Sequence, residues 1–545
     1  MIQNVRNSRI IFGVWLLMIV MFTACIKEEF TLSKLDTSVD LDPALATPLG
    51  YFDFRMDENL QTSENAIISS NPDRIVSLNY FGEIISEPAG DLFSFDPVNE
   101  SYSIPNPTGG IIDLSRASYE LELSDRVPFF LSNSGGDAKL DSVLLASGIV
   151  RISEIEFPDA IGQVLLVIPG LKLNGESFEA ELNHHDNLVM SEINGYTLEL
   201  TSEEERKNLI DVELYVRYPR QANILFASLP LVSFDFEIVA QEWEIIYGYL
   251  GQEYIDFGRV SFSTDLKENF PGGEFYSIDP RLTFKISNSY SVPLAMGLSN
   301  IVAQTNESGE ILLEGDGIPE PPDYFYPAYP EDALSIGEAR DSFIIDSDNS
   351  NLEEITTSSP TRIDYGVEFL TNPGENKLNN TIFSESKYVT RVELQLPFHG
   401  RAKLLSVQDT MVFDFSRLNF PVDEMINQVI FKLYYENSFP AEIDLQLYLA
   451  DENLEVSDTL FDSFTKVKPA KPVDRFVEDL DFVSGELEAY LPGDKLQNVR
   501  DARYIIGEAL LSTNKDYDVV KIFDNQNLFL NMGIVFDIST SIEDF

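Results

Sequence analysis

The sequence predicts an all-β protein built from tandem antiparallel β-sandwich (immunoglobulin-like) modules with few short helices. The first observation is a strict alternation of apolar and polar residues through 212–217, 232–238 and 443–449. The second is residues 528–538, where every second side chain is apolar, from Leu528 to Ile538. A period of two is typical of strands with one buried face and one solvated face, so antiparallel sheets packed in pairs are expected.

Turn residues divide the alternating segments at short intervals. Asn174-Gly175, Asn194-Gly195, Pro271–Gly273 and Pro492-Gly493 all stand between such segments and favour hairpin turns. Helical signals are short. Residues 201–205 combine two hydroxyl side chains with three glutamates, which suits a helix start, and 351–357 is a second candidate. Neither segment is long enough to form a helical layer.

One phrase occurs twice, about 150 residues apart. A strand ends in Asn288-Ser289-Tyr290 with Pro293 close by, and a second strand ends in Asn437-Ser438-Phe439-Pro440. Asparagine suits such a turn because its side chain bonds to nearby backbone. The repeat indicates two copies of a related sandwich module, or a chance likeness between two β-hairpins.

These signals predict six consecutive regions. They are 1–24, a lipoprotein signal peptide; 25–46, a lipidated tether; 47–251, an N-terminal β-rich region; 252–317, a second β-sandwich module; 318–331, a Pro/Tyr-rich linker; and 332–545, a C-terminal β-rich region. The linker is expected to be a semi-rigid spacer because of its proline content. Its aromatic rings could stack on sugars or pack between the modules that they join, and packing is the preferred interpretation.

The N-terminus has the three parts of a secretory signal. Arg6 and Arg9 precede an apolar run from Ile10 to Phe22, and a small pair leads to Cys25, the single cysteine of the chain. A run of 13 residues is shorter than the ~20 needed to span a bilayer, which favours a cleaved signal. A signal that ends in two small residues and a cysteine predicts lipidation of Cys25, with a plain signal peptide as the alternative.

Three charged residues follow the cysteine. Lys27, Glu28 and Glu29 resemble the Lys-acidic-acidic export signal of lipoproteins displayed on the outer face of Bacteroidetes cells, and this resemblance implies display on the outer surface. An ordinary solvated tether is the alternative. The expected location is therefore the outer membrane, with the protein lipid-anchored and exposed at the surface.

The charge balance excludes one class of partner. The chain has 37 basic and 91 acidic residues, a net charge of −54, which repels nucleic acid phosphates. The same charge repels anionic lipid headgroups, so the membrane partner is expected to be contacted through lipid on Cys25. Solubility is the preferred explanation of the acidity, and attraction of divalent cations or basic partners is the alternative.

Candidate reactive residues are few. Histidine occurs only as His184, His185 and His399; the first two are interpreted as surface residues and the third as a turn residue. Asp346 and Asp348 begin like a calcium loop, but Asn351 and Thr357 stand where an EF-hand needs glycine and glutamate. They are kept as weak calcium candidates. Otherwise no metal, no cofactor and no catalytic residues are predicted.

Taken together, the cysteine with its acidic neighbours, the Tyr247–Gly251 phrase and the hairpins at Asn288 and Asn437 resemble a set of uncharacterised surface-exposed lipoproteins of Bacteroidetes. The resemblance implies a β-sandwich body at the cell surface and supplies no activity. The expected function is a non-catalytic envelope protein for binding, adhesion or scaffolding, with a glycan or an envelope protein as its partner. The alternative is a surface hydrolase that acts on glycans through an unidentified carboxylate pair.

Overall fold

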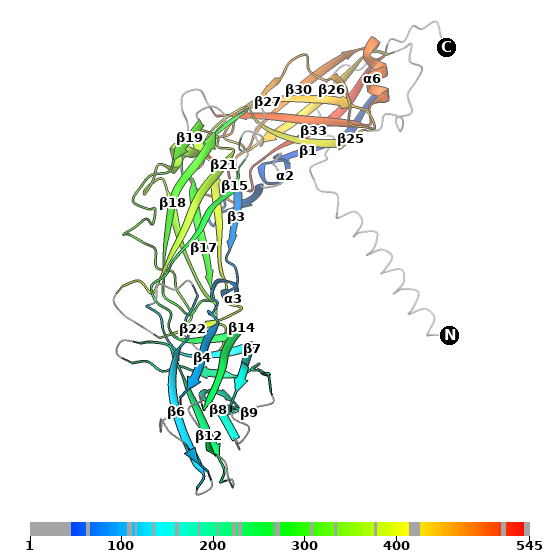
Figure 1. The fold of residues 1–545 in the computed structure, drawn as a ribbon. Helices are drawn as coiled ribbons and strands as arrows, with labels where there is room; N and C mark the ends of the chain where they lie inside the picture. The colour runs from blue at the N-terminus through cyan, green and yellow to red at the C-terminus, as the bar shows by residue number, and fades with distance from the viewer. Residues whose placement is uncertain are drawn as a thin grey trace, which may run out of the picture.

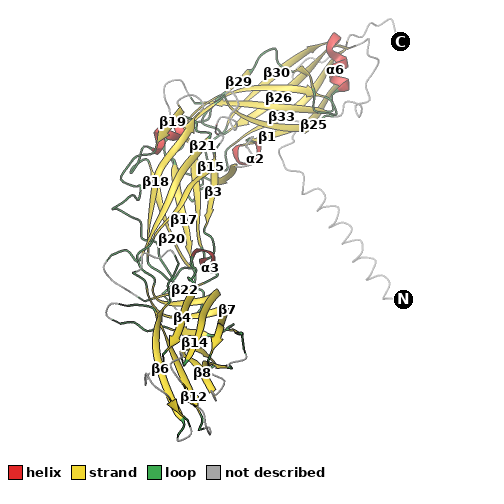
Figure 2. Cartoon of the chain, in the orientation of Figure 1, coloured by secondary structure: helices red, strands yellow, loops and turns green. Residues whose placement is uncertain are grey.

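The computed structural model confirms the all-β prediction (Figures 1 and 2). It describes residues 45–538 except 61–65, 106–111, 115–116, 133–136, 158–162, 184–185, 204–205, 221–224, 227–230, 265, 267–272, 306–308, 332–334, 375–378, 414–425 and 514–518. The α-helices within these residues have four to six residues each. Three sandwiches follow one another in a bent, elongated molecule, and we call them terminal, middle and distal.

The terminal sandwich contains both the first and the last described strand. Its first sheet has the order β1 (Leu45–Arg55), β33 (Asn527–Ile538), β26 (Ile426–Asn437) and β30 (Val483–Pro492). Its second sheet has the order β25 (Leu405–Val412), β31 (Tyr504–Ser512), β27 (Glu442–Ala450) and β28 (Val456–Thr459), with β29 (Thr465–Val467) beside β27. The short helices α2 (Met56–Asn59), η4 (Gly493–Lys495) and α6 (Leu496–Asp501) complete it.

The middle sandwich repeats this arrangement. One sheet has the order β2 (Ala66–Ser70), β3 (Val76–Ile85), β23 (Tyr388–Pro397), β17 (Arg281–Asn288) and β20 (Ala339–Asp346). The other has the order β15 (Tyr254–Ser263), β21 (Arg362–Thr371), β18 (Leu294–Thr305) and β19 (Gly309–Leu312). Helix α5 (Leu352–Thr357) precedes β21 as α6 precedes β31, which confirms the helix predicted at 351–357.

The distal sandwich is one continuous ten-stranded sheet. One layer is β4 (Val98–Ile104), β14 (Val232–Tyr249), β7 (Lys139–Glu156) and β10 (Leu188–Glu192), and the other is β6 (Tyr119–Pro128), β12 (Leu209–Tyr218), β8 (Gln163–Leu173) and β9 (Glu176–Leu182). Strand β11 (Thr197–Glu199) pairs with both layers, and β22 (Asn380–Phe383) extends β14 toward the middle sandwich. Helix α3 (Ala89–Leu92) leads into this part of the chain.

Two small sheets complete the fold. Strands β16 (Glu274–Ser277), β24 (His399–Lys403) and β32 (Val520–Lys521) form a three-stranded sheet between the terminal and middle sandwiches. Strands β5 (Ile112–Asp113) and β13 (Leu225–Phe226) pair with each other.

The three sandwiches are nested, because each begins inside the previous one. In each sandwich a strand of the outgoing part of the chain pairs with a strand of the returning part: β1 with β33, β3 with β23, and β4 with β14. The chain leaves the terminal sandwich after β1, leaves the middle sandwich after β3, and returns in the reverse order. The pairings therefore cross the boundaries expected at 251 and 331, so the sandwiches are not consecutive segments of the chain.

The alternating segments are strands with the predicted buried faces. Ile443, Leu445, Leu447 and Leu449 are fully buried in β27, and five apolar residues of β33 from Leu528 to Phe536 are buried as well. Asn174 and Gly175 have positive φ values of 52° and 86° and form the two-residue turn between β8 and β9. Thr201, expected in a helix, instead forms an isolated β-bridge with Leu209.

The Pro/Tyr-rich segment is not a spacer between modules. Phe325 and Met296 exchange two backbone hydrogen bonds of 2.9 and 2.7 Å, so the segment extends the edge of β18. The Phe325 ring lies 4.7 Å from that of Phe343, in β20 of the same sandwich. The segment therefore closes one edge of the middle sandwich.

Candidate functional site

The predicted anchor residues Cys25, Lys27, Glu28 and Glu29 lie outside the described residues, as do His184 and His185. Within the part of the chain that the structure describes, no helix is both long and apolar enough to cross a membrane.

Asp346 and Asp348 lie in the turn that follows β20. The Asp346 carboxylate accepts a 3.1 Å hydrogen bond from the Asp348 backbone N–H, and Asn349 Oδ1 accepts one of 2.9 Å from the Asp346 N–H. The side chain of Asp346 therefore stabilises the turn through its own backbone. Among the described residues, no group of three or more His, Cys, Asp or Glu side chains is arranged to hold a metal ion.

His399 does not lie in a turn, as the sequence suggested, but begins strand β24. Its Nδ1 atom forms a hydrogen bond with the carboxylate of Asp279. The imidazole is largely buried, at 18% exposure, whereas the aspartate is half exposed. This pair orients the ring at the junction between β16 and β24, where Gly400 approaches the backbone of Tyr276 closely.

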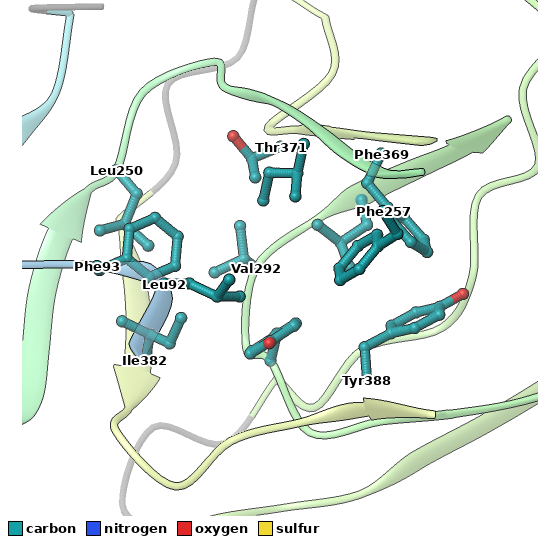
Figure 3. Close-up of a pocket in the computed structure, with 12 residues that line it drawn as sticks. Leu92, Phe93, Leu250, Phe257, Val292, Phe369, Thr371, Ile382 and Tyr388 are labelled. Atoms are coloured by element: carbon teal, nitrogen blue, oxygen red, sulfur yellow. The ribbon is translucent and has the colours of Figure 1, made fainter. Parts of the chain in front are cut away.

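A well-formed cavity lies where the middle sandwich meets the distal one (Figure 3). Apolar side chains from both sides line it, among them Leu92, Leu250, Phe257, Val292 and Phe369. Its volume of about 20 Å³ has room for roughly one water molecule. A second cavity beside Phe275 and Leu396 measures about 10 Å³. Neither of these two cavities can hold a sugar or a peptide.

Carboxylates with shifted pKa values are tied to neighbouring donors. The Tyr490 hydroxyl, and next Lys432, lower the pKa of Glu488. The Arg340 guanidinium lowers that of Glu338, and the backbone N–H of Glu455 lowers that of Asp451. Burial acts to raise the pKa of Asp458, but hydrogen bonds from Lys495 and Asn498 outweigh it and the net shift is downward. Each of these shifts favours the ionised form.

A cluster of exposed and partly buried rings lies on the solvent-facing side of the β1-β33-β26-β30 sheet. We call it the aromatic face, and it consists of Tyr51, Tyr434, Tyr490 and Phe529, one from each strand. Tyr51 and Tyr490 are 59% and 56% exposed, and the Tyr51 and Phe529 ring centroids are 5.4 Å apart. Alternation places these rings outward because their neighbours Phe52, Tyr435, Leu491 and Leu530 are buried in the core.

Register fixes the layout of this face. Tyr51 lies opposite Asn531, which lies opposite Tyr434, and these three residues form one row across the sheet. In the next row Gly533 lies opposite Lys432. A side chain at Gly533 would meet only the Thr47 carbonyl, at 3.4 Å, so the space above this glycine is open.

Carboxylates are distributed among the rings. The Tyr434 hydroxyl donates to Glu436 over 3.3 Å, the Tyr490 hydroxyl donates to Glu488, and Lys432 Nζ lies 3.1 Å from Glu488. Asp53 accepts a hydrogen bond from Asn527, on the row beyond Tyr51. The face thus combines flat apolar surfaces with hydrogen-bond acceptors, and it has fewer cations than carboxylates.

The equivalent face of the middle sandwich is different. The two sheets can be aligned by matching Asn437 with Asn288 and then following the strand partners. This alignment matches Tyr51 with Glu83, Tyr434 with Lys285, Tyr490 with Asp346 and Phe529 with Val389. Arg391 Nε binds Glu83 over 2.8 Å, and Lys285 binds Glu393. Two of these four positions in the middle sandwich are therefore in ion pairs, where the terminal sandwich has rings, and the middle face also has the exposed apolar residues Phe81, Ile85 and Ile344.

The sequence did not single out the aromatic face, because its four rings are separated by up to 478 residues (529 − 51) and only strand pairing assembles them. A signal was available within single strands. Tyr434 and Tyr490 occupy polar-face positions of alternating segments, where charged residues are otherwise expected.

Neither a family model nor a curated protein matches the sequence. Among solved structures, a protein from Parabacteroides distasonis that is described as secreted has 16% sequence identity and a TM-score of 0.28; the match covers 54% of this chain and 88% of that one. The infectious bursal virus T=1 particle protein has 8% identity, a TM-score of 0.13, and coverage of 82% and 78%. At these TM-scores the likenesses do not define a shared fold.

Proposed function

We propose that this chain is a non-catalytic, lipid-anchored protein of the outer membrane, displayed on the cell surface, whose sandwiches bind an extracellular glycan or an envelope partner. The nested order of the strands is the observation that carries this proposal. Strand β1 begins at Leu45, directly after the proposed tether, and belongs to the terminal sandwich. The distal sandwich lies at the opposite end of the molecule (Figure 1).

This geometry suits a protein held at one end. A lipid on Cys25 would fix the terminal sandwich near the membrane, and the other two sandwiches would extend from it. The chain crosses each junction on its way out and on its return, and the segment with β22 reaches the distal sheet a second time. The small β16-β24-β32 sheet and the Arg74–Asp524 ion pair of 2.8 Å add contacts at the first junction. An extended body whose junctions the chain crosses more than once favours presentation of surfaces away from the anchor.

The anchor is tested by metabolic labelling with a fatty acid analogue in cells that express the full chain. We expect label on the wild type and its loss in Cys25→Ala, with Asp42→Ala as a control that keeps it. Label that is unchanged in Cys25→Ala would refute lipidation at this residue.

Surface display is tested on the same cells with a protease that does not enter the periplasm. We expect cleavage of the wild-type chain on intact cells. Replacement of Lys27, Glu28 and Glu29 by alanine is expected to leave the chain lipidated but protected. Protection of the wild type would instead place the protein on the periplasmic side.

A further inference from the structure

We infer that the aromatic face of the terminal sandwich is a binding site for a neutral polysaccharide. This inference rests on the proposed function, since it names the ligand class that a surface-displayed body would take. The chemistry of the face and its contrast with the middle sandwich carry it.

The rings supply the attractive surface. A tyrosine or phenylalanine ring offers a flat apolar face, and the C–H face of a pyranose ring packs well against such a surface. Tyr51 and Tyr434 lie two strands apart in the same row, a separation of about 10 Å at ordinary strand spacing. Because a rigid sheet holds both rings, a polymer of more than one sugar unit can contact them together without ordering a loop.

The charges on the face decide between ligand classes. Asp53, Glu436, Glu486 and Glu488 are distributed among the rings, and Lys432 is already engaged by Glu488. A polyanion is repelled by this arrangement. A neutral polyol is complementary to it, because each carboxylate has more acceptor sites than its present donor uses and a sugar offers several hydroxyl donors.

A basic protein is the competing occupant, but the existing contacts disfavour it. The Tyr490 hydroxyl and Lys432 both contact Glu488, Tyr434 contacts Glu436, and Asn527 contacts Asp53. A cationic partner would have to compete with these donors, whereas hydroxyl groups can add to them. The absence of a side chain at Gly533 leaves the backbone between the rings uncovered at this position.

The middle sandwich provides an internal reference for the inference. The same topology keeps Glu393 at the position of Gly533, and it pairs Glu83 with Arg391 where the terminal sandwich has Tyr51 and Asn531. Asn531 makes no such pair, and its Oδ1 is buried without a hydrogen-bond partner among the described residues. Rings at these four positions are therefore not required by the fold, although the middle sandwich has an exposed ring of its own at Phe81.

The experiment is affinity electrophoresis of the purified mature chain in polyoxyethylene detergent. The gels contain neutral β-glucan, α-glucan, mannan, galactan or xylan, and parallel columns carry polylysine. We expect retardation in at least one neutral polysaccharide, with an apparent Kd that rises about tenfold or more in Tyr51→Ala, Tyr434→Ala and Gly533→Glu. The last variant keeps every ring and blocks the space between them. Phe81→Ala, which removes a 47% exposed ring from the corresponding sheet of the middle sandwich, is the matched control and is expected to bind normally.

Three outcomes would overturn the inference: no retardation in any of the five polysaccharides, retardation that all three variants retain, or polylysine binding that the same variants abolish. The last would assign the face to a basic protein. The proposed function fails separately. A chain that is not lipidated or not displayed would refute that proposal while leaving the gel result unchanged, whereas a displayed chain that no polysaccharide retards would refute only the glycan site.

Discussion

The terminal and middle sandwiches share their main strand order and the same Asn-Ser-aromatic connection from one sheet to the other, yet equivalent positions on their solvent-facing sides differ. In both, the repeated asparagine is fully buried and its Oδ1 accepts a 2.9 Å hydrogen bond from the backbone N–H two residues later. Its amide then donates to a carbonyl of an irregular proline-containing segment, Ala328 in the middle sandwich and Lys468 in the terminal one. The serine that follows each asparagine also has the same role. Ser438 Oγ accepts a hydrogen bond from the backbone N–H of Asn527, the first residue of β33, and Ser289 Oγ accepts one from the N–H of Lys387, the residue before β23.

The residues that the two sandwiches share at equivalent positions stabilise the fold. The outer-face residues that differ between them are not needed for the fold in that form. The contrast at the four equivalent positions, which are rings in one sandwich and mainly charged residues in the other, is the basis of the proposed binding site. The predictions below test this division, beginning with the positions that should matter most for stability.

Substitutions of large core residues should lower the free energy of unfolding strongly in both sandwiches. Phe284 and Leu433 are equivalent, and the smaller Leu433 is compensated by Met532 where the middle sandwich has Val392. We expect Phe284→Ala to lower the stability of the middle sandwich by about 3–5 kcal/mol and Leu433→Ala that of the terminal one by about 2–5 kcal/mol, because both leave cavities. Hydrogen exchange followed by mass spectrometry would assign each loss to its own sandwich. Losses below about 1 kcal/mol would show that these cores collapse around the gap.

Replacing either of the two repeated asparagines should lower the free energy of unfolding to a similar extent in the two sandwiches. Asn288→Ala and Asn437→Ala each leave a backbone N–H and a carbonyl without their partner, and each unsatisfied buried group costs about 1–3 kcal/mol. We expect losses of roughly 2–4 kcal/mol, together with faster proteolysis of residues 318–330 in the first variant and 468–482 in the second. Asn99→Ala, on the exposed side of β4, is the control. A large loss of stability in only one of the two variants would show that the two asparagine turns do not have the same role.

The strands and the two Asn-Ser-aromatic turns were predictable because their signals are local, but the expectation that these turns close β-hairpins was wrong, because each joins strands of two different sheets. Alternation in 443–449 and the two Asn-Ser-aromatic turns need no knowledge of distant residues. The nesting was not predictable, since no local feature of residues 45–55 indicates a partner at 527–536, and hydrophobic alternation is equally compatible with many pairings. The aromatic face was not predictable for the same reason, because Tyr51 and Tyr434 are brought into one row only by the strand between them, β33.

Exchanging one outer-face residue should have unequal effects in the two sandwiches. Glu393→Gly removes the partner of Lys285 and places glycine within β23, so we expect a loss of roughly 1–2 kcal/mol. Gly533→Glu enters open space beside Lys432 and is expected to range from no change to a gain of about 1 kcal/mol. Thermal unfolding of the two variants measures the contrast. A marked loss in Gly533→Glu would mean that this glycine serves the fold and not a ligand.

The smallest expected effect is on how stability depends on pH in the acidic range. The Tyr490 hydroxyl, followed by Lys432, lowers the pKa of Glu488 below that of an ordinary glutamate. Any stability that this group contributes is therefore present above its unfolded-state pKa and is lost as the pH falls through the lowered folded-state pKa. Solvent screens the group, so we expect Glu488→Gln to be only slightly less stable than the wild type near neutral pH. The difference should disappear in acid, and Tyr490→Phe should reduce it. The middle sandwich has Ile344 at the equivalent position, so Ile344→Val should shift stability by the same amount at every pH. A difference between Glu488→Gln and wild type that stays constant with pH would show that Glu488 is not held ionised by its neighbours, and that the carboxylates of the aromatic face are not oriented as the register implies.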